Sequence, residues 1–137
     1  MGRILAIDYG GKRTGIAVSD SLQIIATGLP TVSTKDIFKF LIEYCKNEIV
    51  DIFVIGESKH LDNTKTKIAI EVEKFAEKLK VLFPNIPIHW IDERFTSKIA
   101  KQSMIMSGMK KKKRRQKEIV DEISATLILQ SFMNSNK

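Results

Sequence analysis

Residues 4–18 read ILAIDYGGKRTGIAV, and this stretch holds two short apolar runs separated by a glycine-containing turn. The pattern predicts a strand at about 4–8, a tight turn, and a second strand at about 14–19. Asp8 ends the first apolar run. Because burying an unpaired charge is costly, a core strand has no local reason to end in a carboxylate. Asp8 is therefore a candidate for holding a metal ion or facing a phosphate group.

The rest of the chain alternates between extended and helical patterns. The elements predicted from apolar spacing are strand 24–32, helix 35–48, strand 52–55, helix 64–82, strand 86–91, helix 97–107 and helix 116–132. Pro30 suits an edge strand, and residues 33–36 resemble a capping box that would open the first helix. The continuous apolar run at 52–55 is typical of a strand buried on both faces. Trp90 is expected in the core.

This order predicts the fold class. Three adjacent strands favour an antiparallel meander, and the two later strands arrive through helices, so they should join in parallel. We therefore expect an α/β fold with a mixed five-stranded sheet flanked by helices. The length of 137 residues suits a single domain spanning 1–137.

The positive charge is confined to one segment. The net charge is +7, and the segment 110–117 holds seven of the 23 basic residues; the remaining 16 equal the 16 acidic ones. Such a cluster on an otherwise balanced domain indicates a phosphate-rich partner, although a solvated lysine-rich loop is the alternative. The basic residues are Lys110, Lys111, Lys112, Lys113, Arg114, Arg115 and Lys117.

Composition also bounds the location. No apolar stretch approaches the roughly 18 residues of a membrane span, and the N-terminus lacks the pattern of a secretory signal. The one cysteine, Cys45, falls on the apolar stripe of a predicted helix, which suggests a buried, inert thiol. We expect a cytoplasmic protein with no membrane contact.

Acidic residues follow three of the predicted strands. Asp8, Glu57 and Asp92 each lie at or just past a strand end, and the carboxyl ends of parallel strands share one edge of a sheet. Asp121 is a fourth candidate, because its helix places it on the apolar face with Ala125. A charge on that face needs a partner, either a metal ion or a salt bridge to a basic residue. The candidate salt-bridge partners are Lys12, Arg13 and Arg94.

Clustered carboxylates without Cys or His ligands suit Mg²⁺ or Mn²⁺. Two such ions stabilise the attacking and leaving oxygens of a phosphodiester displacement. Of the two histidines, His89 lies within a predicted strand and is expected to be structural, and His60 is a weak candidate for substrate contact. The pattern thus favours nuclease chemistry beside a polycationic segment.

Three segments resemble the YqgF/RuvX family. Residues 7–20 are similar to its opening motif, residues 92–96 (DERFT) to its DER-x-[ST] motif, and residues 120–129 to its final helix. The resemblance covers nearly the whole chain in order and spacing. It implies an RNase H-like fold and a nuclease proposed to resolve Holliday junctions or to process the 5′ end of pre-16S rRNA.

Site residues follow from the same resemblance. Asp8 and Asp121 match the family's acids, and Asp92 matches the acid of the DER motif, with Glu93 as its competitor. The sequence departs from the family after the fourth strand, where Gly56-Glu57-Ser58 replaces the usual Gly-Leu-Pro. Glu57 stands where related RNase H-like nucleases often supply a metal-binding acid.

The leading hypothesis is an Mg²⁺- or Mn²⁺-dependent endonuclease, acting as a monomer or weak homodimer on rRNA precursor or branched DNA. Asp8, Glu57, Asp92 and Asp121 would hold the metal. The expected phosphate contacts are Lys12, Arg13, Arg94 and the basic residues of 110–117. One alternative is a non-catalytic nucleic-acid-binding factor in ribosome assembly. An ATP-binding relative is disfavoured, because the chain lacks a second phosphate-binding hairpin.

Overall fold

The fold is built on one mixed sheet. The structure, a computed structural model, describes residues 2–57, 67–92 and 117–135, and for Glu57, Asp92 and residues 117–123 it describes the backbone alone. Its elements are β1 (Arg3–Asp8), β2 (Arg13–Ser19), β3 (Ala26–Ser33), the 3-10 helix η1 (Thr34–Asp36), α1 (Ile37–Asn47), β4 (Val50–Glu57), α2 (Lys67–Leu82), β5 (Ile88–Asp92) and α5 (Lys117–Ser135). No helix in these ranges is long and apolar enough to cross a membrane.

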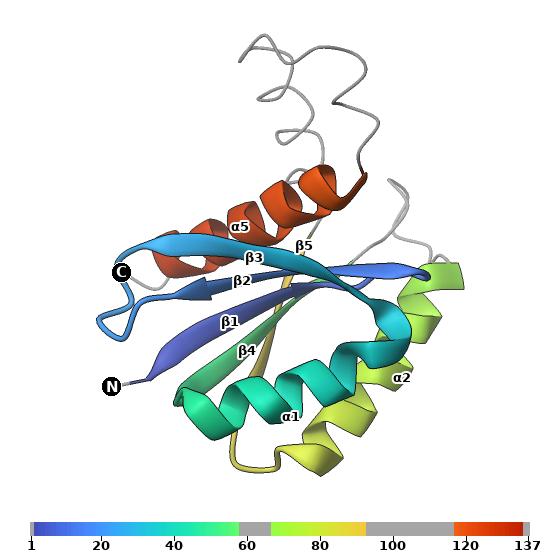
Figure 1. Ribbon diagram of the computed structural model, residues 1–137, viewed down its shortest axis with the longest axis horizontal. Helices are drawn as coiled ribbons and strands as arrows, with labels where there is room; N and C mark the ends of the chain where they lie inside the picture. The colour runs from blue at the N-terminus through green and yellow to red at the C-terminus, as the bar shows by residue number, and fades with distance from the viewer. Residues whose placement is uncertain (1, 58–66, 93–116, 136–137) are drawn as a thin grey trace, which may run out of the picture.

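The strand order is β3-β2-β1-β4-β5 (Figure 1). The first three strands pair antiparallel, β4 joins β1 in parallel, and β5 joins β4 in parallel. This topology confirms the predicted α/β class and the mixed five-stranded sheet. It also places β1 at the centre of the sheet, with β2 and β4 as its neighbours.

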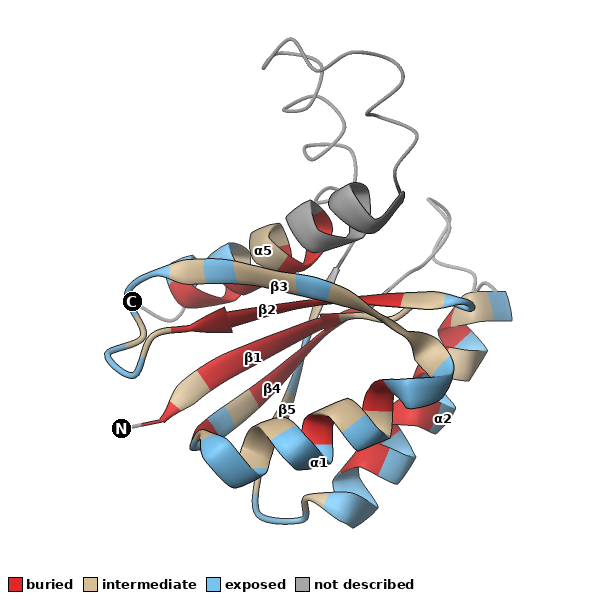
Figure 2. Cartoon of the chain, viewed as in Figure 1, coloured by how far each residue is buried: buried red, intermediate tan, exposed pale blue. Residues whose placement is uncertain are grey.

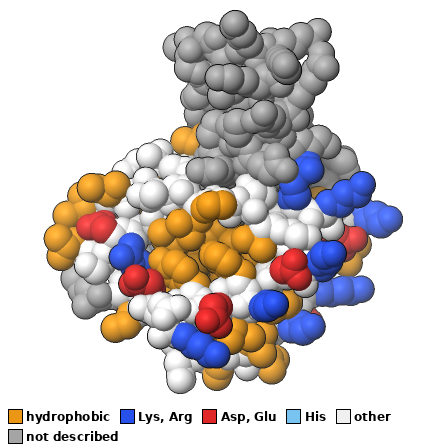
Figure 3. Space-filling view, in the orientation of Figure 1, with side chains coloured by type: hydrophobic (Ala, Val, Ile, Leu, Met, Phe, Trp, Pro, Cys, Tyr) orange, Lys and Arg blue, Asp and Glu red, His pale blue; other side chains and the backbone are white. Residues whose placement is uncertain are grey.

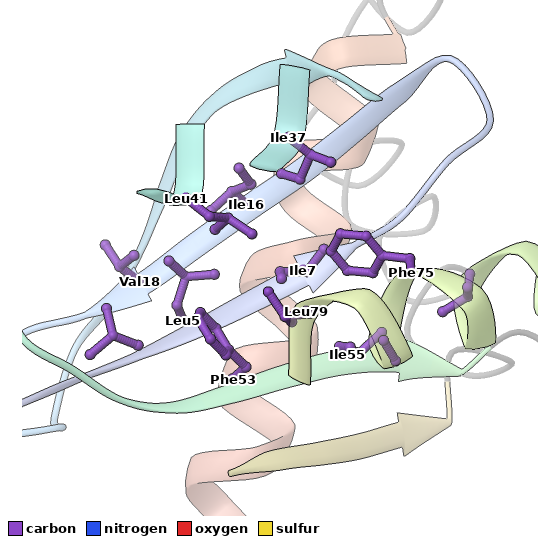
Figure 4. Close-up of a cluster of buried hydrophobic side chains, with 13 residues drawn as sticks. Leu5, Ile7, Ile16, Val18, Ile37, Leu41, Phe53, Ile55, Phe75 and Leu79 are labelled. Atoms are coloured by element: carbon purple, nitrogen blue, oxygen red, sulfur yellow. The ribbon is translucent and has the colours of Figure 1, made fainter. Parts of the chain in front are cut away.

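Helices cover both faces of the sheet. α1 and α2 lie on one face and α5 on the other (Figure 1). Side chains alternate along each strand, so β4 sends Phe53 and Ile55 into the core under α1 and α2, and Val54 into the core under α5. All three are fully buried, which confirms that this strand is covered on both faces (Figure 2). Figure 4 shows the first core, where Leu79 of α2 meets the sheet.

β3 is an edge strand, as Pro30 predicts. Its pairing with β2 shifts between Thr14 and Ile16, whose partners are Val32 and Leu29. The extra residue in β3 forms a bulge that includes Pro30, a place where a missing backbone N–H is tolerated.

Two local predictions are wrong. Residues 33–36 do not form a capping box: Ser33 ends β3, and neither Ser33 nor Asp36 makes a side-chain cap hydrogen bond. The segment forms the η1 turn instead, and the hydroxyl of Thr34 bonds to Gly10. Trp90 is 40% exposed rather than in the core, because β5 is the other edge strand and α2 covers it only in part. The predicted helix 97–107 lies outside the described residues.

Candidate functional site

Three adjacent parallel strands end in acidic residues. Asp8 is the last residue of β1, Glu57 of β4 and Asp92 of β5. In the parallel register Ile7 is level with Ile55, and Glu57 is level with Asp92. The backbone therefore brings the three residues to one edge of the sheet, within about 10 Å from β1 to β5 at the usual strand spacing. We call this the acidic edge.

Asp8 faces the side of the sheet that α5 covers. It follows Ile4 and Ala6 at alternate positions of β1, and both of these pack in the core under α5. Asp8 itself is half-buried and pairs with Gly15 in the β1–β2 ladder. The carboxylate at the end of β1 is thus partly shielded from water, so its electrostatic interactions are stronger than those of a fully exposed carboxylate.

α5 runs across the sheet from the side where β1 ends (Figure 1). Ala125 and Ile128 on its inner face are fully buried, and Phe132 is 5% exposed. Asp121 lies one turn before Ala125 in the same helix. The predicted apolar face of this helix is therefore confirmed from Ala125 onward, and Asp121 precedes it along the helix.

A cationic turn joins β1 to β2 beside the acidic edge. Residues 9–12 form this β1–β2 turn, in which Lys12 is exposed; Arg13, which opens β2, is half-buried. A Cβ atom at Gly10 would collide with the carbonyl oxygen of Arg13, whereas one at Gly11 would meet nothing within 4 Å. Figure 3 shows Lys and Arg side chains gathered on the side of the molecule where β1 ends.

The turn is tied to the end of β3 through Thr34. The Thr34 hydroxyl donates to the carbonyl oxygen of Gly10 at 2.6 Å and lies 2.9 Å from the hydroxyl of Thr14, which is fully buried. The Thr34 amide donates to the carbonyl oxygen of Lys12 at 2.9 Å. Sequence reasoning missed these contacts, because residues 24 positions apart carry no spacing signal.

Tyr9, the residue after Asp8, packs on the other face of the sheet, in the core under α1 and α2. Its ring centroid lies 4.8 Å from that of Phe75 in α2. Burial, followed by the nearby Glu71 carboxylate, raises the pKa of the Tyr9 phenol. The phenol therefore stays protonated near neutral pH, and its ring anchors the start of the β1–β2 turn against α2.

The remaining site predictions lie outside the described residues or concern side chains that are not described. Arg94, Glu93, His60 and residues 110–115 belong to the first group. The side chains of Glu57, Asp92, Asp121 and Lys117 belong to the second. Among the described side chains, no group of three or more His, Cys, Asp or Glu residues could hold a metal ion. The four-carboxylate metal site therefore stays a prediction. His89 packs its ring 5.1 Å from that of Phe132, in keeping with a structural role.

Comparison with known proteins finds a family model and relatives that match nearly the whole chain. The RuvX family model, described as Holliday junction resolvase, matches residues 2–135. A protein of Christiangramia forsetii, named "Putative pre-16S rRNA nuclease", is 53% identical over 133 residues and covers 97% of this chain and 98% of its own. A protein of the same name from Parabacteroides distasonis is 50% identical over 137 residues, covering 100% and 98%.

Two solved structures share the architecture at low sequence identity. Fowlpox virus resolvase, in complex with Holliday junction DNA, has a TM-score of 0.62 at 14% identity and covers 98% of each chain. RuvC of T. thermophilus, also with a Holliday junction substrate, has a TM-score of 0.58 at 15% identity, again over 98% of each chain. These likenesses confirm the predicted RNase H-like fold. With the family model matched from residue 2 to residue 135, the chain belongs to the RuvX (YqgF) family.

Proposed function

We propose that this protein is a metal-dependent endonuclease that hydrolyses phosphodiester bonds in structured nucleic acid. Its substrate would be the precursor of 16S rRNA or a four-way DNA junction. The observation that carries the proposal is the acidic edge, where β1, β4 and β5 end in Asp8, Glu57 and Asp92. Membership of the RuvX family and the nuclease names of its relatives support it.

The four acids would share one task. Asp8, Glu57, Asp92 and Asp121 offer only carboxylate oxygens, the donors that Mg²⁺ and Mn²⁺ prefer. When bound, such ions lower the pKa of water and stabilise negative charge on a leaving oxygen. The half-buried position of Asp8 fits this task, because a partly desolvated carboxylate favours a nearby cation more strongly than an exposed one.

Cations around the acidic edge would hold the substrate. Lys12 and Arg13 follow Asp8 by four and five positions in the sequence, and Arg94 follows β5. The basic segment 110–117 precedes α5 and would add further phosphate contacts. Such contacts position a nucleic acid without reading its sequence, and they weaken as salt rises. Specificity would then rest on the shape of a folded RNA or a branched DNA.

The test is cleavage of both substrates with Mg²⁺ or Mn²⁺, comparing the wild type with Asp8→Asn. Asp36→Asn is the matched control, because Asp36 is an exposed acid in η1 and belongs to none of the strand ends. We expect Asp8→Asn and excess EDTA to abolish cleavage and Asp36→Asn to retain it. Equal cleavage by the wild type and Asp8→Asn would contradict the proposal. Binding without cleavage by both would identify a non-catalytic nucleic-acid-binding factor.

A further inference from the structure

We propose that Thr34 is a positioning residue that fixes the β1–β2 turn, so that the exposed Lys12 side chain of this turn meets the phosphate backbone of the substrate. The inference rests on the proposed function, because it assumes a nucleic acid at the acidic edge. Thr34 lies in η1, 24 positions after Gly10. It acts through the turn rather than by touching the reacting atoms.

Hydrogen-bond directions around Thr34 are set by chemistry. The carbonyl oxygen of Gly10 can only accept, so the hydroxyl of Thr34 donates to it at 2.6 Å. A hydroxyl has one proton, so Thr34 must accept in its 2.9 Å hydrogen bond with Thr14, and the Thr14 hydroxyl is the donor. The chain of donors therefore runs from Thr14 through Thr34 to the backbone of the turn.

One residue thus holds the turn at two backbone positions. The Thr34 hydroxyl holds the carbonyl of Gly10, and the Thr34 amide holds the carbonyl of Lys12 at 2.9 Å. Thr14 is fully buried, so water has no access to replace its partner. At Gly10 the turn also passes too close to the Arg13 carbonyl to admit a side chain. The backbone from which the exposed Lys12 side chain projects is therefore set by Thr34.

Replacing Thr34 with a side chain of the same shape but no hydroxyl should release the β1–β2 turn. Thr34→Val keeps the branched side chain and the hydrogen bond from the backbone amide of residue 34 to the carbonyl oxygen of Lys12, but it has no hydroxyl to donate to the carbonyl oxygen of Gly10. We expect weaker binding to a four-way DNA junction and a shallower dependence of log affinity on log salt. The slope should fall by about 0.9 for each phosphate that the variant no longer neutralises. The KM should rise more than kcat falls, because the acids of the acidic edge are untouched. Thr34→Ser keeps the hydroxyl and should restore both quantities.

A double variant separates positioning from stability. In Thr34→Val the buried Thr14 hydroxyl has no acceptor, so the protein should unfold at a lower temperature. Thr14→Val/Thr34→Val removes both hydroxyls, so neither position leaves a buried hydroxyl without a partner, and the unfolding temperature should recover. The carbonyl of Gly10 remains untied in the double variant, so the shallow salt slope should persist. If Thr34 served stability alone, unfolding temperature and salt slope would recover together.

The experiment measures unfolding temperature, junction affinity across a salt series, and amide exchange of residues 9–14 in the wild type and these variants. Thr27→Val, on the exposed far part of β3, is the control for removal of a threonine hydroxyl and should match the wild type. Faster turn exchange and a shallow slope in Thr34→Val and the double variant support the inference. Unchanged slope and exchange in Thr34→Val overturn it and leave the proposed function standing. A wild type that binds neither junction nor RNA overturns both, whatever the exchange shows.

Discussion

Two neighbouring glycines in the β1–β2 turn should respond to alanine with opposite signs. At Gly11 an added Cβ meets nothing within 4 Å, and the backbone φ is not in the left-handed region. Gly11→Ala should therefore stabilise the protein by about 0.4–1 kcal/mol, because alanine restricts the unfolded chain. At Gly10 the Cβ would strike the Arg13 carbonyl oxygen, and Thr34 holds the Gly10 carbonyl in place. Gly10→Ala should cost about 1–3 kcal/mol.

The two variants should thus differ by about 1.4–4 kcal/mol in the free energy of unfolding. For a chain of this size, that difference corresponds to about 5–15 °C in unfolding temperature and about 0.7–2 M in the urea midpoint. The fluorescence of Trp90, the one tryptophan of the chain, reports the transition from β5. If the two variants were equally stable, or if Gly11→Ala were less stable than Gly10→Ala, the turn geometry and the role given to Thr34 would be refuted.

Three further predictions test the core and two titrating groups. Leu79→Ala should lower the free energy of unfolding in urea by about 2–5 kcal/mol, because Leu79 is fully buried between α2 and the sheet. Val81→Ala, at a 78% exposed position of the same helix, should change it by no more than about 0.5 kcal/mol. Hydrogen bonds from backbone amides lower the pKa of Asp20 from its ordinary 3.8. The ionised carboxylate therefore stabilises the folded protein above pH 3.8, and this stabilisation is lost as the pH falls through the lowered pKa. Asp20→Asn should flatten the acid end of the stability profile, and an unchanged profile would contradict this. Cys45 is half-buried rather than buried as expected, and this burial raises the pKa of its thiol above 9.0. Native protein should therefore react with a disulfide reagent more slowly than urea-unfolded protein at mildly alkaline pH, and equal rates would contradict this.

The sheet could be predicted because its signals are local. The apolar runs at 4–7, 16–18 and 52–55, and the helices between the later strands, are enough to predict the antiparallel meander and the parallel direction of the two later strands. The strand order, with β4 beside β1, comes from the structure. Pro30 in addition marks the edge strand. The placement of Asp8, Glu57 and Asp92 at one edge then follows from topology alone, since each ends a parallel strand.

Other features could not be predicted, because they depend on interactions between distant segments. The pattern at 33–36 has the composition of a capping box, yet the Thr34 hydroxyl donates to the Gly10 carbonyl oxygen in the β1–β2 turn, 24 positions earlier in the chain. The exposure of Trp90 depends on β5 being an edge strand that α2 covers only in part. The glycine turn looks uniform in sequence, but of its two glycines only Gly10 has a backbone atom in the way of a side chain. Composition records which groups are available, and packing decides how each is used.

We propose that the carboxylates at the acidic edge and on α5 form a metal site. Crystals of the protein soaked in Mn²⁺ test it directly, through anomalous difference density. We expect a peak among the carboxylates of Asp8, Glu57, Asp92 and Asp121, at about 2.0–2.3 Å from their oxygens, that disappears in Asp8→Asn. Crystals of the wild type with no peak there, or with the same peak in Asp8→Asn, would contradict it.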